Sequence, residues 1–308
     1  IEVRYKLEIS KNDTISSINN IKNTAAIKII TNRNDKEVED SDGTDNNTDS
    51  DYLKTKIYAV GIEKYVTGVG ENGLITSTDN INYNCNVNSR ENHPNYAKNE
   101  YDKSTNDNRV RVEPGDYVTF TIKVKNTGTK DGKADYANYG KISTTTISES
   151  FTDGSNCKLV YDSITGATYD KKQITFKKDI VPGGSATFTI KFKVEVTGNL
   201  TGTQQNLENT ATIGESSISN RNSVPVKDSD GDKNNTDSDY LRTKIYKVAL
   251  EKYVTKVNRY DLSTTAGKDY NVKELTNRKG KPTYDTDKSK ANDIVNLETG
   301  DTVTFAIT

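Results

Sequence analysis

The sequence predicts an all-β protein: tandem immunoglobulin-like antiparallel β-sandwich domains joined by acidic linkers. Composition is the first reason, because hydrophobic residues make up only 31 % of the chain, Met and Trp are absent and there are 18 Tyr. This balance is typical of short, half-buried strands with polar turns. The second reason is a series of about seven short segments in which apolar and polar residues alternate between turn signals, as in a sandwich. The third is an internal repeat.

Residues 40–66 read DSDGTDNNTDSDYLKTKIYAVGIEKYV, and residues 228–254 read DSDGDKNNTDSDYLRTKIYKVALEKYV, 188 positions later (228 − 40). A period of this length fits one domain plus one linker. The 308 residues therefore hold one complete unit and parts of two others. We expect the following division: the C-terminal part of a preceding sandwich at 1–36, an Asp/Asn-rich linker at 37–56, a complete sandwich at 57–224, a second linker at 225–244 and the N-terminal part of a following sandwich at 245–308.

The complete unit opens with an extended segment, YLKTKIYAVGIEKYVTGV at 52–69. Its alternation places four side chains on one face: Val60, Ile62, Lys64 and Val66. A long connection rich in Asn, Asp, Ser and Gly follows at 70–108, and its pattern predicts no secure element. After a Pro-Gly-Asp turn at 114–116, apolar residues again alternate with polar ones at Val118, Phe120, Ile122 and Val124.

The second half of the unit contains the remaining predicted strands. Residues 143–151 place Ile147, Glu149 and Phe151 on one side, and 158–160 and 174–176 are shorter candidates. A Pro-Gly-Gly turn at 182–184 precedes the clearest alternation in the chain, at Phe188, Ile190, Phe192, Val194 and Val196. The last predicted strand is ENTATI, which carries Asn209, Ala211 and Ile213 on one face.

Three polar residues stand where the alternation predicts apolar ones: Lys64, Glu149 and Asn209. Because an unpartnered buried charge is costly, we expect them to meet. One interpretation is a buried salt bridge beside an amide. The other is chemistry, because burial lowers the pKa of a lysine to give a neutral, nucleophilic amine and keeps a carboxyl protonated for proton transfer. The product would be an amide between Lys64 and Asn209, with loss of ammonia.

The motifs IEKYVTGV and LEKYVTKV, then VRVEPGDYVTFTIKVKNTGTKDGKA, then ENTATI followed by DSDGDKNNTDSDY, resemble the isopeptide-forming repeat domains of Gram-positive bacterial surface and fimbrial, adhesin-like proteins. The resemblance covers essentially the whole chain. It implies that Lys64 in the first strand reacts with Asn209 in the last, assisted by an acidic residue of a middle strand that matches Glu149. At that strand TTTISESF departs from the usual acidic-apolar-Pro pattern. The resemblance also implies an acceptor, Asn23, in the preceding domain and a donor, Lys252, in the following one.

Each predicted linker carries five aspartates: Asp40, Asp42, Asp45, Asp49 and Asp51 in the first, and Asp228, Asp230, Asp232, Asp237 and Asp239 in the second. Alternate oxygen ligands in a Gly-containing loop suit Ca²⁺, and the carboxylates would repel one another without a cation. One interpretation is therefore a linker that calcium stiffens. The alternative is a solvated acidic linker without metal.

Two cysteines, Cys85 and Cys157, fall within the complete unit. The residue that matches Cys85 in the next copy is Val272, so this thiol is not part of the repeat's common plan. A disulfide between the two in an oxidising compartment and two unpaired thiols remain alternatives. The spacing of these cysteines and His93 matches no compact zinc site.

The charges exclude several function classes. Lys and Arg number 43 against 44 Asp and Glu, so no net field favours nucleic acid or a membrane surface. No apolar run is long enough to span a membrane. With one His and no nucleophile or phosphate-loop motif, we expect no enzyme beyond the single-turnover crosslinking.

The sequence thus favours a structural repeat segment of an extracellular stalk or fibre on a bacterial surface or appendage. Its partners would be further repeats of the same protein, including lateral self-assembly into a fibre. The alternative is an adhesin module that contacts a host or matrix ligand through the 70–108 loop, because variable loops on a rigid scaffold are common recognition sites.

Overall fold

The computed structural model describes residues 4, 20–39, 47–74, 83, 109–200, 202–229, 234–258, 260–261, 295 and 297–308. The elements named within these ranges are all β-strands, which confirms the all-β class. The chain divides into two compact units, residues 1–245 and 246–308.

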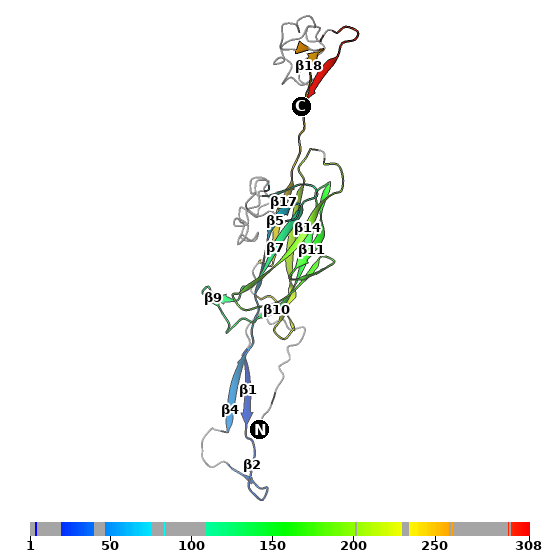
Figure 1. Cartoon of the computed structure of the whole chain (residues 1–308). Coiled ribbons are helices and arrows are strands. Elements are labelled where there is room, and N and C mark those ends of the chain that lie inside the picture. The colour runs from blue at the N-terminus through cyan, green and yellow to red at the C-terminus, as the bar shows by residue number, and fades with distance from the viewer. Residues whose placement is uncertain are drawn as a thin grey trace. The chain divides into compact units, whose positions relative to one another are not determined.

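Two sheets form the body of the first unit (Figure 1). One is antiparallel throughout and has the order β11 (Cys157–Thr165), β14 (Ser185–Val196), β7 (Tyr117–Asn126) and β5 (Val60–Gly70). The other has the order β12 (Thr168–Asp170), β13 (Gln173–Ile180), β10 (Ile142–Thr152), β15 (Asn206–Asn220), β17 (Thr236–Thr243) and β6 (Val110–Val112), with β16 (Pro225–Val226) on β15. Its strands pair antiparallel except β17 and β6, which are parallel.

The core lies where the alternation predicts it. Inward positions of β7, β14 and β15 are buried, and aromatic rings from both sheets meet between them. Phe192 makes edge-to-face contacts with Phe120 at 5.9 Å and Phe151 at 5.2 Å between ring centroids. The strands expected from the alternation are all present, as β5, β7, β10, β11, β13, β14 and β15. Val196 is an exception to the predicted face, since it is 46 % exposed at the last position of β14.

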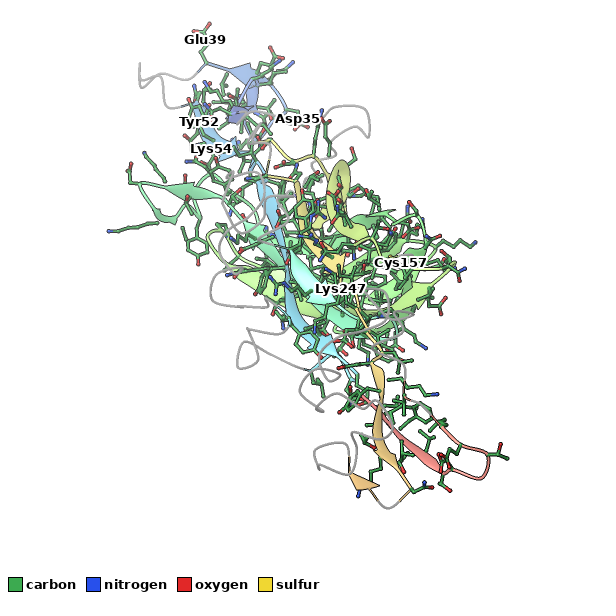
Figure 2. All side chains as sticks on the ribbon, turned by 90° about the horizontal axis from the view of Figure 1, so that it is seen from above. Asp35, Glu39, Tyr52, Lys54, Cys157 and Lys247 are labelled. Atoms are coloured by element: carbon green, nitrogen blue, oxygen red, sulfur yellow. The ribbon has the colours of Figure 1, made fainter. Side chains whose placement is uncertain are left out.

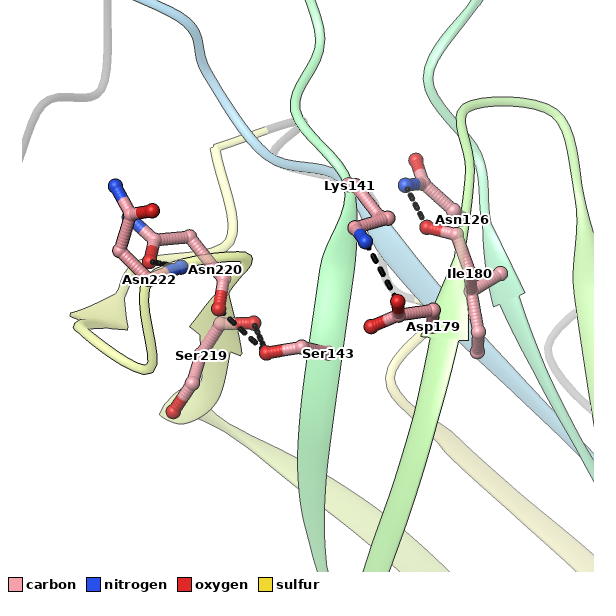
Figure 3. Close-up of polar contacts among 8 residues, drawn as sticks. All are labelled: Asn126, Lys141, Ser143, Asp179, Ile180, Ser219, Asn220 and Asn222. Carbon is pink, nitrogen blue, oxygen red and sulfur yellow. Dashed lines mark hydrogen bonds and ion pairs between the residues drawn. The ribbon is translucent and has the colours of Figure 1, made fainter.

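A set of polar contacts holds the two sheets together near the end of β7 (Figure 3). Asn126 is buried, and its Nδ2 donates to the carbonyl oxygens of Gly140 and Ile180, both at 3.0 Å. Close by, the Lys141 ammonium pairs with the Asp179 carboxylate at 2.6 Å. Because Asn126 belongs to one sheet and Ile180 to the other, its carboxamide fixes their separation there.

Both predicted linkers contain strands. The second, 225–244, supplies β16 and β17, and β17 is an inner strand of its sheet. In the first, 37–56, the segment β4 (Thr48–Lys54) pairs with β1 (Asn20–Ala26), and Tyr52 and Lys54 project from it (Figure 2). The segment TDSDYL resembles a loop by composition, but in the second copy its aspartates, Asp237 and Asp239, accept backbone N–H groups of β5 that only the folded chain brings near.

Short hairpins complete the first unit: β2 (Ile30–Thr31) pairs with β3 (Glu37–Val38), and β8 (Thr129–Lys130) with β9 (Lys133–Ala134). The second unit contains β18 (Lys252–Val257), which pairs with β19 (Tyr260–Asp261) and with β20 (Val303–Ile307).

Candidate functional site

The predicted trio comes from three strands on two sheets. Lys64 lies on β5, whereas Glu149 lies on β10 and Asn209 on the neighbouring strand β15 of the other sheet. In the register of β10 and β15, Glu149 is opposite Ala211 and Phe151 is opposite Asn209. Glu149 and Asn209 are therefore diagonal neighbours on one face, and this face is turned toward Lys64.

Lys64 and Glu149 meet inside the sandwich. The Lys64 Nζ donates to Glu149 Oε2 at 2.6 Å, and both side chains are completely buried. The same ammonium lies 5.0 Å from the centre of the Phe120 ring, so apolar and aromatic groups replace water around it. The expectation that these two residues meet is confirmed.

Asn209 is also buried, but its carboxamide is differently placed. Among the described residues, neither its Oδ1 nor its Nδ2 has a hydrogen-bond partner of normal geometry, and Glu149 Oε1 has none either. Asn209 is nevertheless close enough to Glu149 to oppose the rise that burial causes in the pKa of that carboxyl. A buried carboxamide without partners is costly for a folded protein, which makes Asn209 the anomalous residue of the site.

Burial sets the protonation of the pair. It lowers the pKa of Lys64, although the charges of Glu149, Asp237 and Asp239 oppose this effect. Burial likewise raises the pKa of Glu149, against the opposing effects of Lys64 and Asn209. Both directions favour a neutral amine beside a neutral carboxylic acid.

Two buried aspartates lie next to the trio, although the sequence pattern predicts them in a linker. Asp237 Oδ2 accepts the backbone N–H of Lys64 at 2.6 Å, and Asp239 Oδ2 accepts that of Val66 at 2.7 Å. In the register of β15 and β17, Asp239 is opposite Asn209. The available signal was the period-two spacing of the aspartates in TDSDYL, which fits a strand.

The duplicated sequence gives the same geometry in the flanking segments. In β1 and β4, Asn23 is opposite Asp51, just as Asn209 is opposite Asp239. The Thr24 and Ser50 hydroxyls then contact at 2.9 Å, as those of Thr210 and Ser238 do at 2.7 Å. Unlike Asn209, Asn23 is exposed.

Lys252 repeats the position of Lys64. It is opposite Ile307 in β20 as Lys64 is opposite Ile122 in β7, and each strand has its register shift two residues later. The Lys252 Nζ lies 4.4 Å from the centre of the Phe305 ring. The strand pairing of the sequence repeat is therefore reproduced in both flanking segments.

The structure places two of the predicted calcium ligands inside the sandwich. Asp237 and Asp239 are not ligands exposed in a linker, because they are buried in the sandwich and accept backbone N–H groups. Both oxygens of Asp228 also accept hydrogen bonds, from Val60 N and Asn235 Nδ2. Within the described ranges, no three His, Cys, Asp or Glu side chains are placed to hold a metal together. Asp40, Asp42, Asp45, Asp230 and Asp232 lie outside the described residues, whereas Asp49 and Asp51 are exposed on β4.

Cys157 is a free thiol on β11 (Figure 2). It is buried, and burial raises its pKa, so it is a poor nucleophile. Cys85 lies outside the described residues, so its pairing stays a prediction.

Most of the 70–108 loop, which the adhesin alternative requires, also lies outside the described residues. A pocket of about 510 Å³ lies elsewhere, beside Ser143, Lys177, Lys178 and Asp179. It is open and polar, and Asp179 is already paired with Lys141. In the part of the chain that the structure describes, no helix has the length and apolar character to cross a membrane.

No protein-family model and no curated protein sequence matches the chain. The structure is similar to that of a family 123 glycoside hydrolase from Clostridium perfringens, with 11 % identity, 62 % of this chain and 28 % of that chain covered, and a TM-score of 0.23. It is also similar to the full-length major pilin SpaD from Corynebacterium diphtheriae, with 10 % identity and a TM-score of 0.22. That match covers 80 % of this chain and 65 % of the pilin. The RrgB pilus protein from Streptococcus pneumoniae is similar with 12 % identity and a TM-score of 0.22. That match covers 66 % of this chain and 39 % of RrgB. The chain covers less than two thirds of each of these proteins, and similarities this distant carry no argument about function.

Proposed function

We propose that the chain is a structural repeat segment of an extracellular stalk or fibre on a bacterial surface, stabilised by an intramolecular isopeptide bond between Lys64 and Asn209. The observation that carries the proposal is the contact of Lys64 with Glu149 in a dry core, beside an Asn209 carboxamide for which the described residues offer no hydrogen bond of normal geometry. A salt bridge alone would explain the first two residues but not the third.

The reaction would balance as follows. The neutral Lys64 amine attacks the Asn209 carboxamide carbon, and the protonated Glu149 donates a hydrogen bond to the carbonyl oxygen. Glu149 then gives its proton to the departing amide nitrogen, which leaves as ammonia, and takes one back from the lysine nitrogen, so it ends protonated as it began. One C–N bond forms and one breaks, so the step needs no oxidant or second substrate. The product amide cannot ionise, so the reaction also ends the cost of burying an ionisable lysine.

The position of the bond supports a mechanical role. It would join the two sheets and close a loop of 145 residues (209 − 64). By analogy with disulfide loop closure, this constrains the unfolded chain by about 5 kcal/mol. Asn23 and Lys252 repeat the strand positions of Asn209 and Lys64, as a chain of similarly linked domains requires. The partners would be further repeats of the same protein, with calcium stiffening of the acidic segments as a separate proposal.

Intact mass tests the proposed bond. We expect the chain to weigh about 17 Da less than its sequence because one ammonia is lost. A proteolytic digest should contain a branched peptide that joins Lys64 to Asn209. Lys64→Ala and Asn209→Ala should each restore the full sequence mass, and Glu149→Gln should delay the loss after refolding.

The matched control is Lys158→Ala, which removes a half-exposed lysine from β11 and should keep the reduced mass. An unmodified mass in the wild-type chain would refute the crosslink and leave the buried salt bridge as the role of Lys64 and Glu149.

A further inference from the structure

Among the strands that the structure describes, β5 forms an edge of its sheet and has β7 as its neighbour in the strand order. Alternate N–H groups of such a strand point away from the sheet and need other acceptors. Here the acidic segment provides them in chain order: Val60 N donates to Asp228 Oδ1 at 3.1 Å, Ile62 N to Asn234 O at 2.9 Å, Lys64 N to Asp237 Oδ2 at 2.6 Å and Val66 N to Asp239 Oδ2 at 2.7 Å.

The two aspartates of β17 bridge the sheets. The backbone of β17 pairs with β15 and β6 in one sheet, while the carboxylates of Asp237 and Asp239 reach the edge of the other. They are only 1 % and 0 % exposed. Hydrogen bonds to a carboxylate are about twice as strong as neutral ones. Of the contacts of this kind on β5, those of Asp237 and Asp239 are buried and short, at 2.6 Å and 2.7 Å.

The contacts also determine the relative direction of β5 and β17. Lys64 donates to Asp237, and Val66, two residues later, donates to Asp239, two residues later in β17. The two strands therefore run parallel, and Figure 1 shows them side by side. The chain enters β5 at its N-terminal end, near Val60, and leaves β17 at its C-terminal end, near Thr243. In a parallel pair these ends lie at opposite ends of the contact. A pull along the chain therefore slides β5 past β17 and loads all four contacts together.

We propose that Asp237 and Asp239 form a load-bearing clamp, which carries tension directly from the incoming strand β5 to the outgoing strand β17. The proposal rests on the proposed function in that it assumes tension along the chain. It assigns to these aspartates a mechanical role in place of metal binding. The crosslink alone would not provide this role, because tension leaving Asn209 would still run through the 34 residues to Thr243 (243 − 209).

The clamp can be measured by pulling the full chain from its two ends in a single-molecule instrument. In the crosslinked chain, rupture of the clamp should release at most these 34 residues, or about 120 Å of contour length. In the double variant Asp237→Asn and Asp239→Asn the force of this step should fall roughly twofold, because two charge-assisted hydrogen bonds are weakened together.

The duplicated sequence offers a matched control. Asp49 and Asp51 occupy the same motif but are exposed on β4, so Asp49→Asn with Asp51→Asn should leave this rupture force unchanged. Native-state hydrogen exchange gives a second readout if the double variant folds poorly. In the single variant Asp239→Asn, the Val66 amide should exchange faster than in the wild type, whereas the β7 amides should not.

An unchanged rupture force together with unchanged exchange at Lys64 and Val66 would overturn the clamp. The crosslink is read separately, by intact mass. If the mass is unmodified, the rupture should release far more than 34 residues, but the effect of the aspartate variants on its force would still decide the clamp.

Discussion

At the scale of single residues, the site combines groups that are each unfavourable in a protein core. Lys64 and Glu149 are charged residues in ordinary conditions, yet both are buried and contact each other. The Asn209 carboxamide lies in the same place and makes no hydrogen bond of normal geometry with the described residues. A product amide would remove the ionisable lysine amine and the Asn209 amide nitrogen together. The residue types that destabilise the unreacted fold are thus the reactants of the proposed bond.

The pH dependence of stability tests the state of Glu149. The measurement compares Asn209→Ala, which cannot form the bond, with the double variant Asn209→Ala and Glu149→Gln. Because the pKa of Glu149 is raised in the folded state, the folded chain holds its proton more tightly than the unfolded chain. The stability that Glu149 adds should be fully present below its ordinary pKa of 4.5 and should be lost as pH rises through the folded value.

Urea unfolding of both proteins across this range measures the difference in their free energies of unfolding. Lys64 is present in both, so its own titration contributes mainly through its contact with residue 149. A difference that grows as pH rises would mean that the Glu149 pKa is lowered instead, as an ordinary ion pair requires.

At the scale of elements, the sequence predicted the strands whose side chains alternate and missed the one whose aspartates are satisfied by distant donors. Lys64, Glu149 and Asn209 were visible as polar misfits in apolar alternations, which is a local signal. The roles of Asp237 and Asp239 were not visible, because their donors lie 173 positions away in the chain. A buried carboxylate in a strand is recognisable only when its tertiary partners are known.

The place where the domain ends is testable by truncation. A chain that stops after residue 245 keeps β17, whereas one that stops after residue 224, the end expected from sequence, lacks it. The shorter chain leaves the outward N–H groups of β5 without acceptors, at a cost of roughly 1–3 kcal/mol for each group that stays buried. We therefore expect the longer chain to melt cooperatively and resist protease, and the shorter one to melt at a much lower temperature. Equal melting temperatures would show that β17 is dispensable.

At the scale of the whole molecule, the repeat places similar strand pairs in both units, since β18 and β20 reproduce the register of β5 and β7. Successive domains would then differ mainly in their loops, such as the segment 70–108. The acidic segment between Asn209 and Lys252 belongs largely to the first unit, which extends to residue 245. The chain between neighbouring domains is accordingly shorter than the acidic composition suggested.

Calcium binding remains a prediction for the acidic loops. If Ca²⁺ binds the folded state and not the unfolded state, a Ca²⁺ concentration 100 times the Kd should raise the free energy of unfolding by about 2.7 kcal/mol. Thermal unfolding would detect this change. A chelator should reverse the shift and change the small-angle scattering of the full chain. Asp230→Asn with Asp232→Asn should abolish the response, while Asp49→Asn with Asp51→Asn serves as a comparison for the first copy. Melting curves and scattering that do not respond to chelator would dismiss calcium.

The position of β17 after β15 also determines the order in which the domain can be completed. A nascent chain emerges with its amino end first, so Lys64, Glu149 and Asn209 are all outside before Asp237 and Asp239 appear. The reacting groups can therefore collapse together while the edge of β5 is still open, and the aspartates close it last. Because Lys252 emerges only afterwards, the proposed bond of each sandwich could form before the lysine of its successor is available, which would protect a repetitive chain from pairing the wrong copies.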